Sequence, residues 1–504
     1  MKNFIKKWYP LFIILIPAIS LRVNLLLHRG SFWFDELFSI HFSSLPSIKA
    51  TLFYWLIETN PPFYTIFLKF YLLFVGNLNE TLVRLPSLFF SILSIILVYI
   101  FAQKISSRRV AIISSSLMSI STLNLLIATE ARIYSILTFL TIVSFIFYYK
   151  LIIDASSKQN KYLWFLYFVV NLLLLYSHLT SVVIVLTQFI LLFVSLPEKR
   201  IIKKWYKGHI IIFLIYGLWF IPSLYSKLTL KLGSAWYFTA KGNIFDLILK
   251  PIINANRGGF TDTLFYILLI FGIYLLISMI KTSSGIERSK LLLLSLWAFL
   301  PPILSALLNV YILKYITIAY PGLFLLFAYI ADKKINNSKL YYTLCFMVIL
   351  IALPSALEIS SSQIFSWHGI TQYIEENENE SSFTLIPFAE SLPMDRYYKG
   401  TRPVVPIYLN DDDLKFEERL VRFNWSEMQT DKEKIQTWLL DKIQKYDAQT
   451  IYFIGPSTGY EMVDEVLISN GWTLSNTYNQ SGLSLNKLNE FHAPINKTTT
   501  STCQ

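Results

Sequence analysis

The chain has 504 residues, 54% of them hydrophobic, and its apolar residues come in runs of about 18–20, the length that crosses the hydrocarbon core of a bilayer. This composition excludes a soluble protein. The net charge of +12 does not indicate nucleic-acid binding, which needs a basic soluble face. Residues 358–504 hold 21 Asp and Glu against 12 Lys and Arg, and the basic excess lies in short loops between apolar runs.

About eleven apolar runs predict as many transmembrane helices, so the predicted fold is a polytopic α-helical membrane protein. Their ranges are 8–28, 85–104, 110–127, 133–150, 162–177, 179–196, 209–226, 261–281, 291–310, 314–331 and 340–357. Lys2, Lys6 and Lys7 precede the first run. No small-residue cleavage pattern follows, which favours an uncleaved signal anchor over a signal peptide.

The distribution of basic residues predicts the orientation of these helices. If the N-terminus is cytoplasmic, the inner segments hold 20 Lys and Arg, whereas the outer segments, which are longer in total, hold 11. Lys and Arg accumulate in short cytoplasmic loops. We therefore expect a multi-pass protein of the plasma (inner) membrane, with a cytoplasmic N-terminus and an extracytoplasmic C-terminal domain.

Two outer segments are long, at 29–84 and 227–260. Within the first, the stretches 52–57 and 63–75 are semi-apolar, and we expect amphipathic helices that lie along the membrane interface. The alternative for 63–75 is a short span, which would change the number of crossings.

The C-terminal part alternates patterns typical of strands and helices. We expect strands at 382–389, 450–454 and 472–478 and an amphipathic helix at 431–446. These elements predict a small extracytoplasmic α/β domain over 358–493. The polar segment 494–504 is predicted to be a disordered tail.

Seven acidic residues of the membrane part fall on the predicted outer side. They are Asp35, Glu36, Glu58, Glu80, Glu130, Asp246 and Asp262. Ionisable groups at a membrane boundary are costly and usually pair with one another or serve a function. The most distinctive pair follows the first span in Ser31-Phe-Trp-Phe-Asp35-Glu36, among three aromatic residues. The alternative is a solvated loop carboxylate.

Other polar positions stand at the ends of apolar runs. Glu130-Ala-Arg132-Ile-Tyr134 lies at the outer end of the third span, where a local ion pair at a helical turn is the competing explanation. His178 separates two runs and has a structural alternative. Lys314-Tyr315 opens the tenth span, where lysines often extend toward the interface.

Taken in order, these motifs resemble the GT-C superfamily of membrane glycosyltransferases, in particular bacterial relatives of the dolichyl-phosphate-mannose protein mannosyltransferases and the ArnT-type aminoarabinose transferases. The matching segments are Leu21-Arg22, Trp33-Phe-Asp35-Glu36, Asn60-Pro61-Pro62-Phe63-Tyr64, Arg84-Leu85-Pro86-Ser87 and Glu130 to Tyr134. They extend over most of residues 1–330. Lys314-Tyr315 departs from the family's Arg-Tyr pair, because lysine carries a compact charge instead of a planar fork.

The resemblance implies a transmembrane glycosyltransferase domain over 1–357, with the Asp-Glu motif in the outer loop 29–84. It also implies transfer of a hexosyl or pentosyl group from a polyprenyl-phosphate-linked donor, usually with inversion, to a hydroxyl of a protein, lipid or polysaccharide acceptor. The C-terminal domain would recognise the acceptor or cover the site.

The resemblance further assigns roles to individual residues. Asp35 would be the catalytic base. The residues expected to bind substrate are Glu36, Glu58, Arg84, Glu130, Arg132, Tyr134, His178, Lys314 and Tyr315. A divalent metal is left open, and if one is present its ligands would be Asp35, Glu36, Glu58 and Glu130.

Two other classes of protein compete with this interpretation. A transporter or lipid flippase would place polar groups near the bilayer midplane, often in broken helices and repeated halves. Here only Arg22 lies deep in a predicted span, and no two-half symmetry is visible. A polytopic scaffold that presents the C-terminal domain is the second alternative, and the collection of carboxylates on one side weighs against it.

Overall fold

The computed structural model divides into two compact units. It describes residues 2–56, 60–76, 79–154, 159–195, 197–229, 244–249, 259–362, 366–407, 432–456, 461–478 and 486–494. The helical unit comprises Met1–His28, Phe42–Ser226 and Ser234–Ser362. The mixed unit comprises Arg29–His41, Lys227–Gly233 and Gln363–Gln504.

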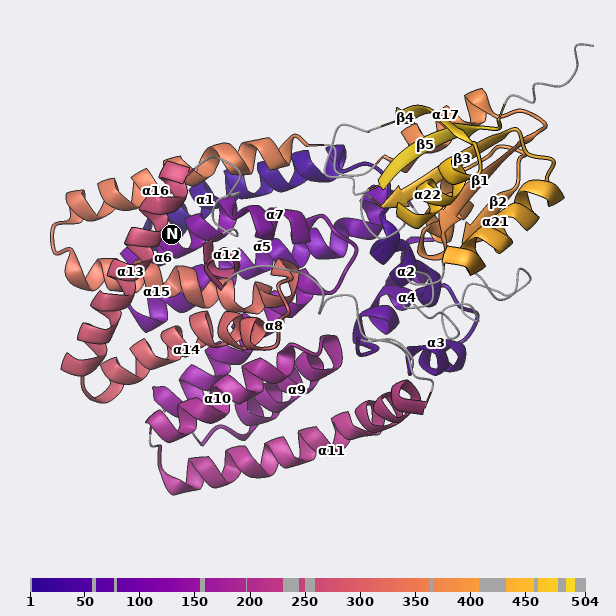
Figure 1. The fold of residues 1–504 in the computed structure, drawn as a ribbon. Helices are drawn as coiled ribbons and strands as arrows, with labels where there is room; N and C mark the ends of the chain where they lie inside the picture. The colour runs from indigo at the N-terminus through magenta and orange to yellow at the C-terminus, as the bar shows by residue number, and fades with distance from the viewer. Residues whose placement is uncertain are drawn as a thin grey trace, which may run out of the picture. The chain divides into compact units, whose positions relative to one another are not determined.

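Helices make up most of the described residues among the first 360 (Figure 1). In chain order they are α1 (Lys2–His28), α2 (Phe34–Ser43), α3 (Ile48–Trp55), α4 (Phe63–Val75), α5 (Glu80–Ile105), α6 (Arg108–Ile120), α7 (Thr122–Ala128), α8 (Tyr134–Tyr148), the π-helical η1 (Tyr149–Ile153), α9 (Lys161–Ser177), α10 (Ser181–Ser195), α11 (Lys199–Thr229), α12 (Ile244–Leu249), α13 (Gly259–Thr282), α14 (Gly285–Leu307), the 3-10 helix η3 (Leu313–Ala319), α15 (Tyr320–Lys334) and α16 (Ser338–Ser360).

The polytopic helical fold predicted from hydropathy is confirmed. Within the described ranges, 7 helices are long and apolar enough to cross a membrane, and there are up to 8 if α6 and α7, bent by 62°, count as one span. The shorter apolar helices α9, α10 and the end of α13 coincide with the three remaining predicted spans. The stretch 63–75 is helical, as expected.

Asparagine side chains begin several of these helices. The Asn79 carboxamide accepts hydrogen bonds from the second and third amides of α5, Asn160 accepts one at the start of α9, and Asn337 accepts two at the start of α16. These caps satisfy amides that have no partner inside the helix. The apolar runs therefore begin where polar capping residues stand in the sequence.

Arg22 lies fully buried in α1, and helix α6 provides its main partners. Its guanidinium donates to the Ser91 hydroxyl at 2.9 Å, to the Ser119 carbonyl at 2.8 Å and to the Met118 carbonyl at 3.4 Å. The last carbonyls of a helix have no intrahelical partner and carry its negative pole. Arg22 therefore stabilises the break between α6 and α7. This structural role explains why a cation lies deep in the helical unit and does not require a transport site.

Arg22→Met should lower the free energy of unfolding by about 2 kcal/mol, because buried carbonyl and hydroxyl groups lose their donor. The thermal midpoint in mild detergent measures this. Arg288→Met is the matched control, since Arg288 is exposed. Equal midpoints for the two variants would contradict the stabilising role of Arg22.

The mixed unit contains a five-stranded sheet with strand order β2-β1-β3-β5-β4. The strands are β1 (Ser382–Pro387), β2 (Val404–Ile407), β3 (Thr450–Pro456), β4 (Thr473–Tyr478) and β5 (Asn486–His492). The other elements are α17 (Trp367–Asn377), η4 (Phe388–Glu390), α18 (Ser391–Tyr397), α21 (Lys432–Lys445) and α22 (Glu461–Ser469). β1 is parallel to β2 and β3, whereas β5 is antiparallel to β3 and β4. The predicted small α/β domain is confirmed.

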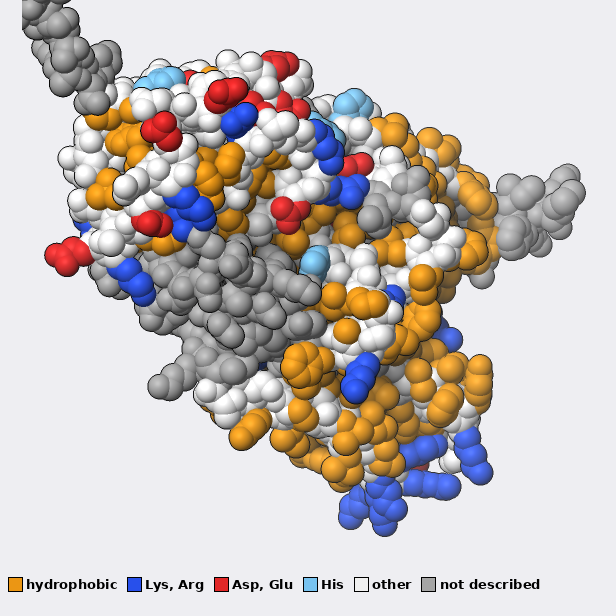
Figure 2. Space-filling model, turned by 90° about the vertical axis from the view of Figure 1, so that its right-hand side faces the viewer, with side chains coloured by type: hydrophobic (Ala, Val, Ile, Leu, Met, Phe, Trp, Pro, Cys, Tyr) orange, Lys and Arg blue, Asp and Glu red, His pale blue; other side chains and the backbone are white. Residues whose placement is uncertain are grey.

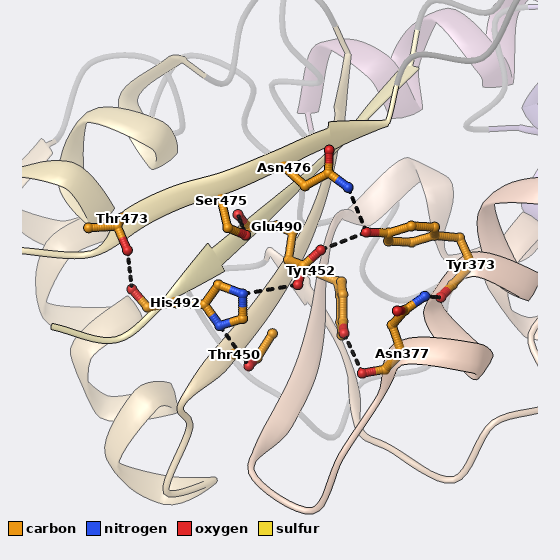
Figure 3. A network of polar contacts seen from close by, with 9 residues as sticks. All are labelled: Tyr373, Asn377, Thr450, Tyr452, Thr473, Ser475, Asn476, Glu490 and His492. Carbon is orange, nitrogen blue, oxygen red and sulfur yellow. Dashed lines mark hydrogen bonds and ion pairs between the residues drawn. The ribbon is translucent and has the colours of Figure 1, made fainter. Parts of the chain in front are cut away.

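The two faces of this sheet differ in chemistry. On one face, apolar side chains of β1, β3 and β5 form a core with α21 and α22. On the other face, polar side chains connect α17 to the sheet (Figure 3). The Tyr373 hydroxyl donates to Glu490 at 2.7 Å, and the Tyr452 hydroxyl donates to the Asn377 carbonyl at 2.7 Å. Burial, together with the hydrogen bond to the Glu490 carboxylate, raises the pKa of Tyr373. These bonds hold α17 against the sheet.

Several sequence predictions fall on residues outside the described ranges. They include Glu58, the residues after 494 and most of the second outer segment.

Candidate active site

Glu130 lies in a tight turn of the helical unit between α7 and α8. The Ser87 hydroxyl of α5 donates to the Glu130 carbonyl at 2.5 Å and lies 3.4 Å from the Arg132 carbonyl. The Arg132 amide donates to the Glu130 carbonyl at 2.8 Å. Ser87 therefore fixes the backbone that carries both ionisable residues. It belongs to a matched motif, but it was not among the predicted site residues.

Glu130 forms an ion pair with Lys314 of η3. The Lys314 ammonium lies 3.5 Å from a carboxylate oxygen, and the side chains are 6% and 18% exposed for Glu130 and Lys314. A pair this buried loses hydration, and loss of either partner leaves an uncompensated charge. The fold thus brings together two predicted site residues that are 184 positions apart.

An aromatic frame surrounds this ion pair. The Lys314 ammonium lies 5.5 Å from the centre of the Tyr134 ring. The His178 ring lies 5.8 Å from Tyr134 and 4.9 Å from Tyr315, and the two tyrosine rings are stacked. The sequence-predicted residues that converge here are Glu130, Tyr134, His178, Lys314 and Tyr315.

His178, in the turn between α9 and α10, is buried and neutral. Burial, and then the positive charges of Arg132 and Lys314, lower its pKa to about 3. The Thr180 amide donates to Nδ1 at 3.2 Å, so the ring proton belongs on Nε2. Nε2 is buried and has no hydrogen-bond partner among the residues placed by the structure. The ring therefore offers an N–H donor to a ligand, without a positive charge.

His178 and Tyr315 also line an apolar groove. It has a volume of about 370 Å³, and Asn60 also lines it. Its apolar lining comes mainly from α10, α14 and η3, and includes Val182, Val183, Leu304, Leu308, Ile316 and Ile318. The groove therefore combines a few polar groups with a mainly hydrocarbon surface. Asn60 was visible in the sequence only as part of the Asn-Pro-Pro bend.

The lowered pKa of His178 predicts a pH-dependent stability. In the unfolded chain a histidine has a pKa near 6.5. As the pH falls below that value, the unfolded state binds a proton that the folded state does not, and this favours unfolding. Between pH 7 and pH 5 the free energy of unfolding of the wild type should fall by about 2 kcal/mol more than that of His178→Gln. Thermal midpoints at both pH values measure the difference. His28→Gln, at an exposed histidine, is the control, and the same pH slope in His178→Gln as in the wild type would refute the assignment.

In the mixed unit, Asp35 and Glu36 stand in the first turn of α2. Glu36 is fully buried, and its carboxylate accepts a hydrogen bond from the Trp33 amide at 3.2 Å. A glutamate three residues after the capping position often closes a helix start in this way. Glu36 therefore closes the start of α2, and its role in binding substrate stays a prediction. Asp35 beside it is partly exposed.

The segment before Asp35 is attached to α17 and α18 of the C-terminal domain. The Phe32 amide donates to the Tyr397 hydroxyl at 2.8 Å, and the His368 amide lies 3.4 Å from the Ser31 hydroxyl. The Arg396 guanidinium lies over the Phe32 ring, 5.1 Å from its centre. The C-terminal domain thus holds the backbone that leads into the Asp35-Glu36 motif, which no sequence pattern indicated.

Two further predicted site residues, Arg84 and Arg132, also belong to the helical unit. Arg84 is buried in α5, and Arg132 is close enough to act electrostatically on His178. In the described part of the chain no group of three or more His, Cys, Asp or Glu is placed to hold a metal ion.

Comparisons with known proteins address the fold as a whole. No curated protein sequence matches the chain. Residues 59–225 match the family described as dolichyl-phosphate-mannose-protein mannosyltransferase. The structure of ArnT from Cupriavidus metallidurans in the apo state aligns with a TM-score of 0.57 at 12% identity, covering 95% of this chain and 97% of ArnT. The chain has the GT-C fold of membrane glycosyltransferases.

Two further structures share the GT-C fold with this chain. ArnT from the same organism bound to undecaprenyl phosphate aligns with a TM-score of 0.53 at 11% identity, covering 95% of this chain and 97% of ArnT. The Archaeoglobus fulgidus oligosaccharyltransferase in the apo form gives a TM-score of 0.53 at 11% identity, covering 90% of this chain and 70% of that one. The GT-C resemblance predicted from the sequence motifs is confirmed.

Proposed function

We propose that this protein is a membrane glycosyltransferase that transfers a sugar from a polyprenyl-phosphate-linked donor to an acceptor hydroxyl. The observation that carries the proposal is the GT-C fold over 95% of the chain. The Glu130–Lys314 pair stands beside Tyr134, and Tyr315, which follows Lys314, lines the apolar groove. This arrangement supports the choice of donor, because a lipid phosphate needs both a cation and a hydrocarbon surface.

The donor's leaving group determines what the site must supply. Negative charge grows on the polyprenyl phosphate as the sugar departs, and fixed cations and donors stabilise it. Lys314, Arg132 and Arg84 are the cations of this proposal, and the neutral His178 adds an N–H donor. The groove would hold the first isoprene units, and Tyr134 and Tyr315 would frame the phosphate.

The acceptor hydroxyl needs a base as it attacks the anomeric carbon. We assign this role to Asp35, whose partly exposed carboxylate stands beside the buried Glu36 cap. Direct attack by the acceptor gives inversion. Glu58 and Glu130 would orient sugar or acceptor hydroxyls. The reaction takes place on the extracytoplasmic side in this proposal, with the N-terminus in the cytoplasm.

The C-terminal domain has a positioning role in the proposed reaction, through Tyr397. Tyr397→Phe leaves the Phe32 amide without its acceptor, so the segment that leads into Asp35 becomes less constrained. We expect transfer to slow by about fivefold, the effect of one net hydrogen bond. Tyr446→Phe in the same domain is the matched control. Unchanged transfer in Tyr397→Phe would argue that the domain acts elsewhere, on the acceptor.

A transporter has less support than an enzyme. Arg22, which lies deep in a predicted span, is engaged by helix carbonyls and by the Ser91 hydroxyl.

The test of the proposed function is mass spectrometry of lipids that co-purify with the wild type and with Asp35→Asn in mild detergent. A polyprenyl-phosphate sugar enriched on the variant would establish the donor and name the sugar. If only bulk phospholipid is found on both proteins, and solute flux into vesicles depends on the protein, the glycosyltransferase proposal is wrong.

A further inference from the structure

Cations gather at the beginning of α9 and α11, away from the groove lining. Four of them recur on α11 at intervals of three and four residues, which places them along one face of the helix. These four residues, here called the basic stripe, are Arg200, Lys203, Lys204 and Lys207. The neighbouring face of α11 is buried in the helical unit and carries Ile201, Trp205 and His209. The stripe therefore has a fixed orientation on the protein.

The basic stripe meets a fifth cation on the neighbouring helix. The Lys204 ammonium lies 4.8 Å from the centre of the Trp164 ring in the first turn of α9. Lys161, which begins α9, and Arg200 are both close enough to Lys204 for their charges to repel it. Lys204 of α11 thus lies over a ring of α9, and cations of both helices stand near it.

This arrangement is electrostatically unfavourable without an anion. Like charges three and four residues apart destabilise a helix, and cations in its first turn oppose the positive pole of the helix dipole. Between residues 159 and 229 the sequence provides one carboxylate, Glu198, against six cations apart from Lys227. In the part of the chain that the structure describes, no carboxylate forms an ion pair with Lys161, Arg200 or Lys204.

The surface next to the stripe is apolar. Beyond Lys207, α11 exposes Ile210, Ile211 and Leu214, and α9 exposes Tyr162 and Phe165. Figure 2 shows Lys and Arg side chains gathered at the lower edge of the view, with apolar side chains directly above them. A ligand that neutralises the stripe therefore also meets a surface suited to acyl chains, and a soluble anion would use only half of this site.

We propose that the basic stripe and Lys161 bind the headgroup of an anionic phospholipid. Its phosphate lies among Lys161, Arg200 and Lys204, and its acyl chains lie along the exposed faces of α9 and α11. Juxtamembrane clusters of Lys and Arg recognise anionic lipids in this way. The site is separate from the polyprenyl-phosphate groove and does not depend on the proposed transfer activity.

The test compares lipid binding of the full chain and of the triple variant Lys161→Gln, Arg200→Gln, Lys204→Gln. Native mass spectrometry in mild detergent follows titration with phosphatidylglycerol or phosphatidylcholine. Each cation near an anionic lipid contributes about fivefold to affinity, so the triple variant should bind phosphatidylglycerol about 100-fold more weakly. Phosphatidylcholine binding should not change.

The control triple variant Lys281→Gln, Lys334→Gln, Lys339→Gln removes the same charge at exposed positions of other basic loops. It should keep the wild-type affinity, and an equal loss in both triple variants would refute a specific site. If millimolar inorganic phosphate displaces the lipid completely, the site serves a soluble anion and the proposal fails. Should the first triple variant not fold, Lys161→Gln alone replaces it, with an expected loss of about fivefold.

Discussion

Replacing Asp35 by asparagine should slow sugar transfer by about 10²–10⁴-fold while the protein keeps its fold, because a general base contributes about that much to a rate. The amide has nearly the same size but cannot accept the acceptor's proton. The Glu36 carboxylate, which closes the start of α2, is untouched by the change. The measurement is consumption of the co-purified lipid-linked sugar in membranes, followed by mass spectrometry.

A control variant and a second measurement make this result specific to Asp35. Asp441→Asn changes a carboxylate that is 71% exposed on α21, and it should leave the rate unaltered. The donor should also accumulate on Asp35→Asn, since binding does not require the base. Turnover of Asp35→Asn near the wild-type rate would assign the base to another residue.

The second large effect concerns Lys314. Lys314→Gln should weaken binding of polyprenyl phosphate by about 100-fold, because truncating one member of a buried charged contact typically costs about 2–5 kcal/mol. Binding of the uncharged polyprenol should not change, since the groove itself is intact. Titration of both lipids into the purified protein separates loss of the phosphate contact from loss of the fold.

Matched variants at the same ion pair sharpen this prediction. Lys314→Arg keeps the charge and supplies the residue expected from the GT-C resemblance, so affinity should stay within about tenfold of the wild type. Glu130→Gln removes the carboxylate that the phosphate must displace from Lys314, so polyprenyl phosphate should bind as well as before or more tightly. Equal weakening of polyprenyl phosphate and polyprenol in Lys314→Gln would show that the lysine only supports the fold.

Hydropathy by itself determined most of the helical unit. A segment that crosses the bilayer must be long and apolar and must satisfy its backbone hydrogen bonds within itself. Each span can therefore be recognised from its own sequence. The sheet was less predictable. β2 is four residues long and contains Pro406. Glu490 of β5 accepts a hydrogen bond from Tyr373 of α17 and lies 3.0 Å from the His492 ring, and no sequence pattern reveals these contacts.

For the candidate site, too, the sequence determined some features and the tertiary structure determined others. The sequence by itself determined which residue types stand at the ends of the predicted spans, because each motif is a short local segment. Only the tertiary structure decided the partners: Glu130 with Lys314, His178 with the groove, and the Asp35 segment with Tyr397. The physical reason is that an ion pair or a buried amide depends on how helices and strands far apart in the chain pack, and hydropathy carries no information about that packing.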